Sequence, residues 1–371
     1  MPSIQSQKSG FTVLELLVAV SVTALLAGML LNITSQVVST QTQASGDLET
    51  NQVAQFILDR IQEDLHCAIY RNDGNVWMAA TILQKTSNSE SWNEVSKGSP
   101  KPQGNEGGPS ESLRITPNDW AEGANDLFAK SNNQIPLHDS RFGVAGTFFR
   151  FFTQAPELDP KAENSGGARA VSYQIIRYGI TKASTSRSRY QLFRSDVSVQ
   201  ETFKAGYDLH PSSEPYSQGS NGSREPANIK NPVFIEGGEL STDFSLASNI
   251  IDFGIRAYLI DKNSYGTGHL KQIFPDVNAS TGGGNPPYEY FATSNTNYRA
   301  SEKPSRLYAF PEVIDVMVRI LTTEGASAIS AYEEGLIPTP SGKNPDEYWW
   351  EIAEKNSEVY TRRVRVIPSG I

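Results

Sequence analysis

Three residues near the N-terminus have types and a spacing that could support chemistry: Gly10, Phe11 and Glu15. A small residue precedes a large aromatic one, and a carboxylate follows the aromatic residue four positions later. Cleavage of the peptide bond between Gly10 and Phe11 would create a free ammonium group close to this carboxylate. The two groups could then form an ion pair, either within one helix or between neighbouring copies of the chain stacked in register.

The acid lies at the start of a long apolar segment. No charged residue occurs from Leu16 to Gly46, and residues 11–33 are almost entirely apolar. A helix of these 23 residues would be about 34 Å long, enough to cross a hydrocarbon core of about 30 Å. A carboxylate in a membrane helix costs about 2–4 kcal/mol when it has no partner. The segment therefore predicts a membrane-spanning helix, and Glu15 needs the positive end of the helix or a cation beside it.

The N-terminal pattern resembles the class III signal of type IV prepilins and secretion pseudopilins. Gly10 matches the residue before the cut, Phe11 the N-methylated new N-terminus, and Glu15 the fifth mature residue. The resemblance implies a leader of residues 1–10, processing by a prepilin peptidase and N-methyltransferase, and assembly through Phe11 and Glu15. A plain signal anchor with an acid near the headgroups is the alternative. A secretory signal peptide fits poorly, because its cleavage site would follow the apolar segment.

Composition limits the other possibilities. The chain has 371 residues and a formal net charge of −9 without a basic patch, so we expect no nucleic-acid partner. The single cysteine, Cys67, excludes an intrachain disulfide. We expect it to pack as a small apolar residue, with an intermolecular bond or a reactive thiol as alternatives. Lys8 precedes the apolar segment, and the next positive charge is Arg60. This favours a cytoplasmic N-terminus and a periplasmic remainder.

Behind the membrane segment the periodicity indicates a second helical part. Apolar residues recur every three or four positions from Val53 to Ile69, with polar residues between them. We therefore predict one long helix, with residues 11–33 as the transmembrane and assembly part. Residues 34–70 form its amphipathic periplasmic spine, and residues 71–371 form a globular antiparallel-sheet domain.

The globular part alternates strand-like segments with polar inserts. Segments typical of strands lie at 74–83, 113–116, 146–152, 170–178, 189–194, 233–235, 250–260, 311–321 and 360–367. The fourth and fifth of them predict a hairpin. Long polar inserts lie near 85–112, 212–232 and 276–306. The predicted fold class is α+β. It is a pilin-like fold with a long N-terminal membrane and spine helix packed on an antiparallel β-sheet with long loop inserts.

The order of these segments is similar to that of the J-type minor pseudopilins of type II secretion and the related W-type minor pilins. The matching residues are the run 58–65, Val171 with Tyr173, Leu192 with Arg194, Phe253 with Tyr258, Pro311 with Val313 and Ile314, and residues 360–364. The chain is considerably larger than that family, and its inserts account for the excess. Its size and layout also resemble the prepilin-like Verru_Chthon cassette protein C group.

No enzyme motif is evident. The four histidines are scattered, so we predict no metal, cofactor or catalytic residue. Residues 282–284 indicate a flexible turn rather than a phosphate site. Residues 261–266 favour a strand-connecting turn, with an oxygen-rich calcium loop as the alternative. Trp349 and Trp350 could form an exposed contact patch or pack inside the domain.

These features predict a non-enzymatic minor pilin or pseudopilin subunit. We expect it in the inner membrane as a single-pass protein, and then in a periplasmic or cell-surface filament tip. Its expected partners are the processing peptidase, inner-membrane lipid and other pilins or pseudopilins. Two alternatives stay open: a membrane-anchored periplasmic binding protein or enzyme, and a minor pilin for adhesion or DNA uptake. The acidic balance argues against DNA binding.

Overall fold

The computed structural model describes residues 12–71, 73–82, 137, 140, 142, 147–154, 167–179, 188–210, 216, 229, 234–236, 239–241, 244–262, 268–275, 289–292, 307–343, 345–366 and 369–370. The chain divides into two units, Met1–Glu49 and Thr50–Ile371. The fold class is α+β, with one long N-terminal helix and mainly antiparallel sheets, in agreement with the predicted pilin-like fold.

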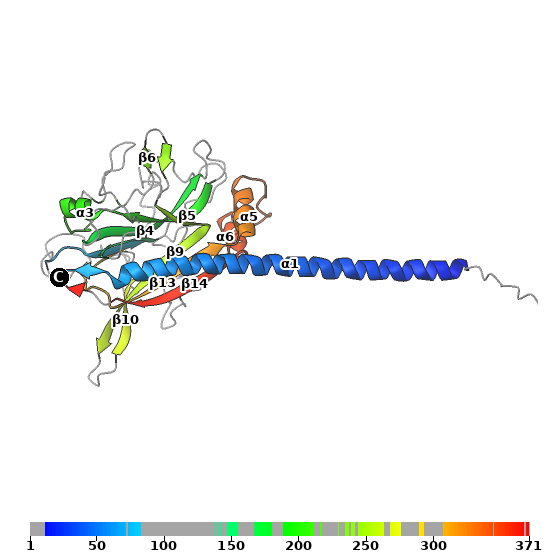
Figure 1. The fold of residues 1–371 in the computed structure, drawn as a ribbon, viewed down its shortest axis with the longest axis horizontal. Helices are drawn as coiled ribbons and strands as arrows, with labels where there is room; N and C mark the ends of the chain where they lie inside the picture. The colour runs from blue at the N-terminus through cyan, green and yellow to red at the C-terminus, as the bar shows by residue number, and fades with distance from the viewer. Residues whose placement is uncertain are drawn as a thin grey trace, which may run out of the picture. The chain divides into compact units, whose positions relative to one another are not determined.

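Helix α1 covers Val13–His66 and has 54 residues, which corresponds to a length of about 81 Å (Figure 1). The predicted helix ran from residue 11 to about residue 69, so the observed end lies a few residues earlier, before strand β1 (Ile69–Tyr70). In the first unit, every side chain described between residues 12 and 41 is exposed. By length and composition, α1 is a helix that could cross a membrane.

The second unit contains a seven-stranded sheet. Its strand order is β12-β11-β2-β3-β4-β5-β8, and all neighbouring pairs are antiparallel except β11 with β12. The strands are β12 (Leu307–Tyr308), β11 (Glu289–Ala292), β2 (Met78–Ile82), β3 (Thr147–Thr153), β4 (Arg169–Gly179), β5 (Ser188–Asp196) and β8 (Ser245–Ser248).

A four-stranded antiparallel sheet has the order β10-β9-β13-β14. It consists of β10 (Gly268–Phe274), β9 (Ile250–Lys262), β13 (Val313–Leu321) and β14 (Ser357–Arg365). Two small sheets pair β1 with β15 (Ser369–Gly370) in parallel, and β6 (Phe234–Glu236) with β7 (Glu239–Ser241). The second unit thus has two main sheets, where the sequence predicted one.

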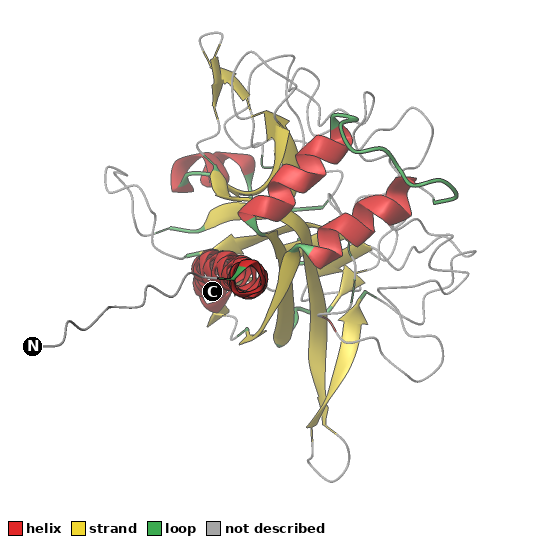
Figure 2. Ribbon diagram, turned by 90° about the vertical axis from the view of Figure 1, so that its right-hand side faces the viewer, coloured by secondary structure: helices red, strands yellow, loops and turns green. Residues whose placement is uncertain are grey.

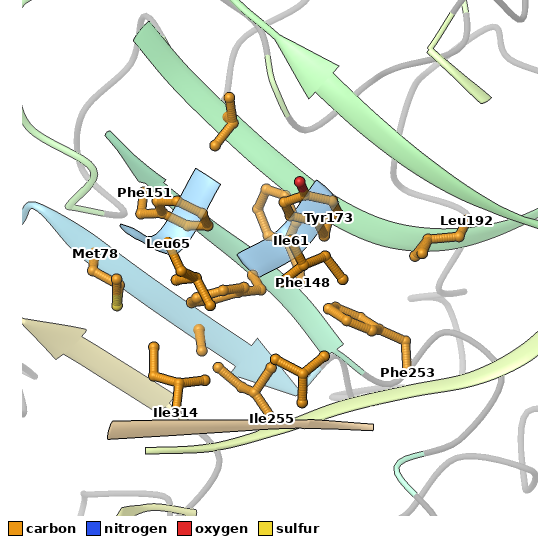
Figure 3. Close-up of a cluster of buried hydrophobic side chains, with 14 of the residues drawn as sticks. Ile61, Leu65, Met78, Phe148, Phe151, Tyr173, Leu192, Phe253, Ile255 and Ile314 are labelled. Carbon is orange, nitrogen blue, oxygen red and sulfur yellow. The ribbon is translucent and has the colours of Figure 1, made fainter. Parts of the chain in front are cut away.

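The core lies where side chains of both main sheets and of α1 meet. Figure 3 shows Ile61 and Leu65 of α1 among side chains from the two sheets. Tyr173 of β4 and Phe253 of β9 have ring centroids 6.3 Å apart, so an aromatic contact joins the sheets directly. The C-terminal part of α1 is therefore a packing element of the domain.

In the part of the chain that the structure describes, three further helices were not predicted: α3 (Val199–Ala205), α5 (Thr323–Glu333) and α6 (Pro345–Lys355). Helices α5 and α6 lie side by side (Figure 2). Trp349 and Trp350 of α6 are buried, which agrees with internal packing and not with an exposed contact patch. The indole Nε1 of Trp349 and the hydroxyl of Tyr190 both donate to Glu333, at 3.0 and 2.7 Å.

The predicted hairpin of residues 170–178 and 189–194 is confirmed by the antiparallel pair β4 and β5. The strand predicted at 113–116 lies outside the described residues, as does most of the three polar inserts. The buried stripe of α1 also differs from the prediction. Phe56 is 54% exposed, whereas the polar residues Arg60 and Asp64 are buried.

Candidate processing and assembly site

The predicted processing residues Gly10 and Phe11 lie outside the described residues, and Glu15 lies in the first turn of α1. One oxygen of the Glu15 carboxylate accepts hydrogen bonds from the backbone N–H and the hydroxyl of Thr12, at 3.0 and 3.1 Å. The Thr12 hydroxyl oxygen in turn accepts from the N–H of Glu15 at 3.3 Å. This reciprocal arrangement is a capping box, in which two side chains satisfy free N–H groups of a helix start.

The capping box gives Glu15 a second role, which was not predicted from its charge. Its signal is present as Thr-x-x-Glu directly before an apolar segment, a recognised mark of a helix start. The carboxylate that was expected to need the positive end of the helix or a cation beside it is thus hydrogen-bonded within its own chain. An assembly role must therefore depend on its charge rather than on an otherwise unmet hydrogen bond.

Two further hydroxyl side chains of the apolar segment are also satisfied locally. The hydroxyls of Ser21 and Thr23 donate to the carbonyl oxygens of Leu17 and Ala19, each at 2.8 Å. Such bonds to the preceding turn remove the cost of a bare hydroxyl in lipid. The remaining surface of the apolar segment is exposed, with Leu14, Leu25 and Leu31 each more than 60% exposed. Such a surface needs lipid or other apolar helices around it.

A second polar cluster lies in the other unit, around the Asp64 carboxylate. Arg194 of β5 donates to both oxygens of Asp64, from Nε at 2.7 Å and from Nη2 at 3.0 Å. The Tyr173 hydroxyl donates to the same carboxylate, and Nη2 of Arg60 lies 3.3 Å from it. The Thr153 hydroxyl donates to the backbone carbonyl of Asp64 at 2.8 Å. The end of α1 is thus tied to strands β3, β4 and β5.

The electrostatics of this cluster keep Tyr173 and Arg194 each in one protonation state. Burial, together with the negative charge of Asp64, raises the pKa of the Tyr173 hydroxyl well above its ordinary value. Burial opposes the positive charge of Arg194. The negative groups beside it, including Asp64, outweigh burial and raise the pKa of Arg194. The Tyr173 hydroxyl therefore stays a donor, and Arg194 stays a cation, across the physiological range.

The short motifs noted in the sequence at 58–65, 171–173, 192–194 and 360–364 supply residues that join α1 to the sheets. Three of them supply Asp64, Tyr173 and Arg194. The last motif supplies Tyr360, whose hydroxyl lies 2.9 Å from that of Thr50, and Arg362, whose guanidinium pairs with Asp59 on α1. These residues therefore join α1 to the sheets.

Other predicted features have plain structural roles. Asp261 and Lys262 lie in β9 and pair with β10, and residues 263–266 lie outside the described residues. Cys67 is half-buried, and burial together with Glu63 and Asp64 raises the pKa of its thiol, which lowers its reactivity. Among the residues that the structure describes, no three His, Cys, Asp or Glu side chains are grouped to hold a metal ion. Residues 282–284 lie outside them.

Comparison with known proteins identifies only the N-terminal segment. A family profile described as the prokaryotic N-terminal methylation motif matches residues 5–31, a range that includes Gly10, Phe11 and Glu15. Searches among curated proteins and among solved structures each found no match to this chain. The profile match and the long apolar helix together support a type IV prepilin-like precursor with an N-terminal membrane anchor.

Proposed function

We propose that this chain is a non-enzymatic minor pilin or pseudopilin subunit. The observation that carries the proposal is the first half of α1, whose exposed apolar surface carries one acid in its first turn. The methylation-motif profile matches the same residues. A large domain on such a helix fits a subunit present in few copies better than a major pilin.

In this proposal the precursor enters the inner membrane with residues 1–10 in the cytoplasm and the globular domain in the periplasm. A prepilin peptidase cleaves after Gly10, and its methyltransferase activity methylates the Phe11 amine. Assembly through the N-terminal helix then places the subunit in the tip of a periplasmic or surface filament. The filament belongs to a type II secretion or type IV pilus-like system, and its other subunits are pilins or pseudopilins.

The proposed assembly chemistry depends on the two charges that processing brings close together. Before assembly, the Thr12 capping box satisfies the hydrogen-bonding capacity of one Glu15 oxygen. In the filament, the Phe11 ammonium of a neighbouring subunit neutralises the Glu15 charge, which costs most in a low-dielectric surrounding. Only subunits in register bring both charges together, so the pair selects register and the apolar surface supplies most of the binding.

Mass spectrometry of the N-terminal peptide of the natural protein tests this proposal. We expect a peptide that begins at Phe11 and carries a methyl group on its amine. A variant with Gly10→Glu should keep residues 1–10, because a large charged residue replaces the small residue at the cut. A natural protein that begins at Met1, or at a residue after Ile33, would contradict the proposal and favour an ordinary anchor.

A further inference from the structure

Six charged side chains in the second unit form a chain in which positive and negative groups alternate. We name it the charge ladder, and its members in order are Glu63, Arg60, Asp64, Arg194, Asp196 and Arg169. Successive members lie 2.7, 3.3, 2.7, 2.7 and 2.9 Å apart. It starts at the half-exposed Glu63 and runs into the domain, where the Arg169 side chain is 2% exposed.

The charge ladder crosses from the helix to the sheet. Three members belong to α1, and the others belong to β4 and β5. Its central ion pair, Asp64 with Arg194, is bidentate and buried, with Asp64 fully buried. A buried ion pair contributes little more to stability than apolar residues of the same size would, because both charges lose their hydrating water. Its best-attested use is to select one arrangement over others.

The apolar contacts around the charge ladder fix the position of α1 on the sheet less strictly than the ion pairs do. Ile61 and Leu65 pack among aliphatic and aromatic side chains, and aliphatic surfaces tolerate sliding and repacking. A shift of α1 by one turn, about 5.4 Å, would separate Asp64 from Arg194. Each buried charge would then keep only the ion-pair partner on its own element, Arg60 for Asp64 and Asp196 for Arg194. The directional hydrogen bonds of Arg194 also restrict rotation of the helix about its axis.

We propose that the charge ladder is a register latch, which fixes the axial and rotational position of the end of α1 on the seven-stranded sheet. Asp64 and Arg194 are its positioning residues, and Tyr173 supports them by donating to Asp64. The proposal concerns the domain alone and holds whether or not the chain enters a filament.

A triple variant separates the latch from ordinary stability. Asp64→Leu, Tyr173→Phe and Arg194→Met replace the centre of the ladder with apolar groups. Arg60 with Glu63, and Arg169 with Asp196, then remain as balanced pairs. Spin labels on the full-length chain in detergent, at the exposed positions Gln55 and Gln200, report the distance between α1 and α3 beside the sheet. Both labels require Cys67→Ser.

The wild-type background should give one narrow distance distribution, and the triple variant should give a broadened or multiple one although it stays folded. The control removes an exposed ion pair through Lys343→Gln and Glu351→Gln, and should leave the distribution narrow. A narrow, unshifted distribution in the triple variant would overturn the latch.

A double-mutant cycle covers the case in which the triple variant does not fold. Asp64→Asn alone and Arg194→Gln alone each remove one side of the central ion pair and leave the other charge buried beside fewer opposite charges. Each should therefore lower the folding equilibrium constant about hundredfold or more. The double variant should be at least tenfold more stable than the product of the two single effects predicts, because both charges leave together. Additive effects in chemical denaturation would overturn the proposed coupling.

Discussion

Two carboxylates on the same helix, Glu15 and Asp64, are held in opposite ways. The Glu15 carboxylate accepts hydrogen bonds from Thr12, three residues away in the sequence, and lies on an exposed turn. Asp64 is fully buried and accepts from Arg194, which lies 130 residues later. A local cap leaves a charge free to find another partner, whereas a buried network commits its charge to one structure. The two halves of α1 are therefore suited to different tasks.

The largest expected effect concerns the charge of Glu15. Under the proposed function, Glu15→Val should insert in the membrane normally but fail to enter filaments, because the Phe11 ammonium of the neighbour has no carboxylate to meet. Glu15→Gln is the sharper variant, because glutamine keeps the capping box and removes only the charge. Sheared filament fractions and membrane fractions, compared by immunoblot, measure both steps. Normal filament entry of Glu15→Gln would mean that Glu15 serves only as a cap.

The next effect concerns the partner of Asp64. Arg194→Met should destabilise the domain by about 3–5 kcal/mol, because it leaves the Asp64 carboxylate buried beside fewer positive charges. Chemical denaturation of the full-length chain in detergent, followed by tryptophan fluorescence, measures the loss. Lys343→Met is the matched control, since it removes an exposed cation and should change stability by less than about 1 kcal/mol. Equal losses of stability in the two variants would mean that buried Arg194 stabilises the domain no more than an exposed cation does.

Removal of the Tyr173 hydroxyl should have a smaller effect. Tyr173→Phe keeps the ring in the core and deletes one hydrogen bond to a charged acceptor, so we expect a loss of about 1.5–3 kcal/mol. The same denaturation experiment measures it. Tyr348→Phe gives the control, because that side chain is not fully buried and should tolerate loss of its hydroxyl. No loss from Tyr173→Phe would mean that Arg194 and Arg60 alone satisfy Asp64.

The smallest effect concerns the cap. Thr12→Val should remove the hydroxyl that receives the Glu15 N–H, at a cost of about 1 kcal/mol to the first helical turn. Hydrogen exchange of the first turn in detergent should then be several-fold faster, with exchange around Asp64 unchanged. Thr12→Ser keeps the hydroxyl and should exchange like the natural chain. Faster exchange in both variants would show that the side-chain volume, and not the cap, protects this turn.

Much of the architecture could be predicted from the sequence because the local patterns of apolar and polar residues were strong. The apolar segment after Glu15 and the periodic segment beyond Val53 both form helix, and residues 170–178 and 189–194 form paired strands, as the patterns predict. The polar character of Arg60 and Asp64 misled the prediction of burial. Their burial depends on Arg194, which local periodicity cannot place beside them.

Other features required three-dimensional information for similar reasons. Helices α5 and α6 pack against each other, and buried Glu333 accepts from Trp349 and Tyr190, so distant partners define that region. At the candidate processing and assembly site, by contrast, the information was present in the local sequence. The Thr-x-x-Glu signal of the cap is present in the sequence, whereas the prediction for Glu15 rested on its charge. Phe11 itself lies outside the described residues.

The hydrogen bond between Thr50 and Tyr360 joins residues 310 positions apart and has a consequence for biogenesis. Ribosomes add about 5–20 residues per second, so about 15–60 s separate the synthesis of the two partners. Strand β1 must likewise wait for β15, at the far end of the chain. Such long-range closure slows folding. The helix is therefore made, and can enter lipid, well before the domain that holds its other end can close around it.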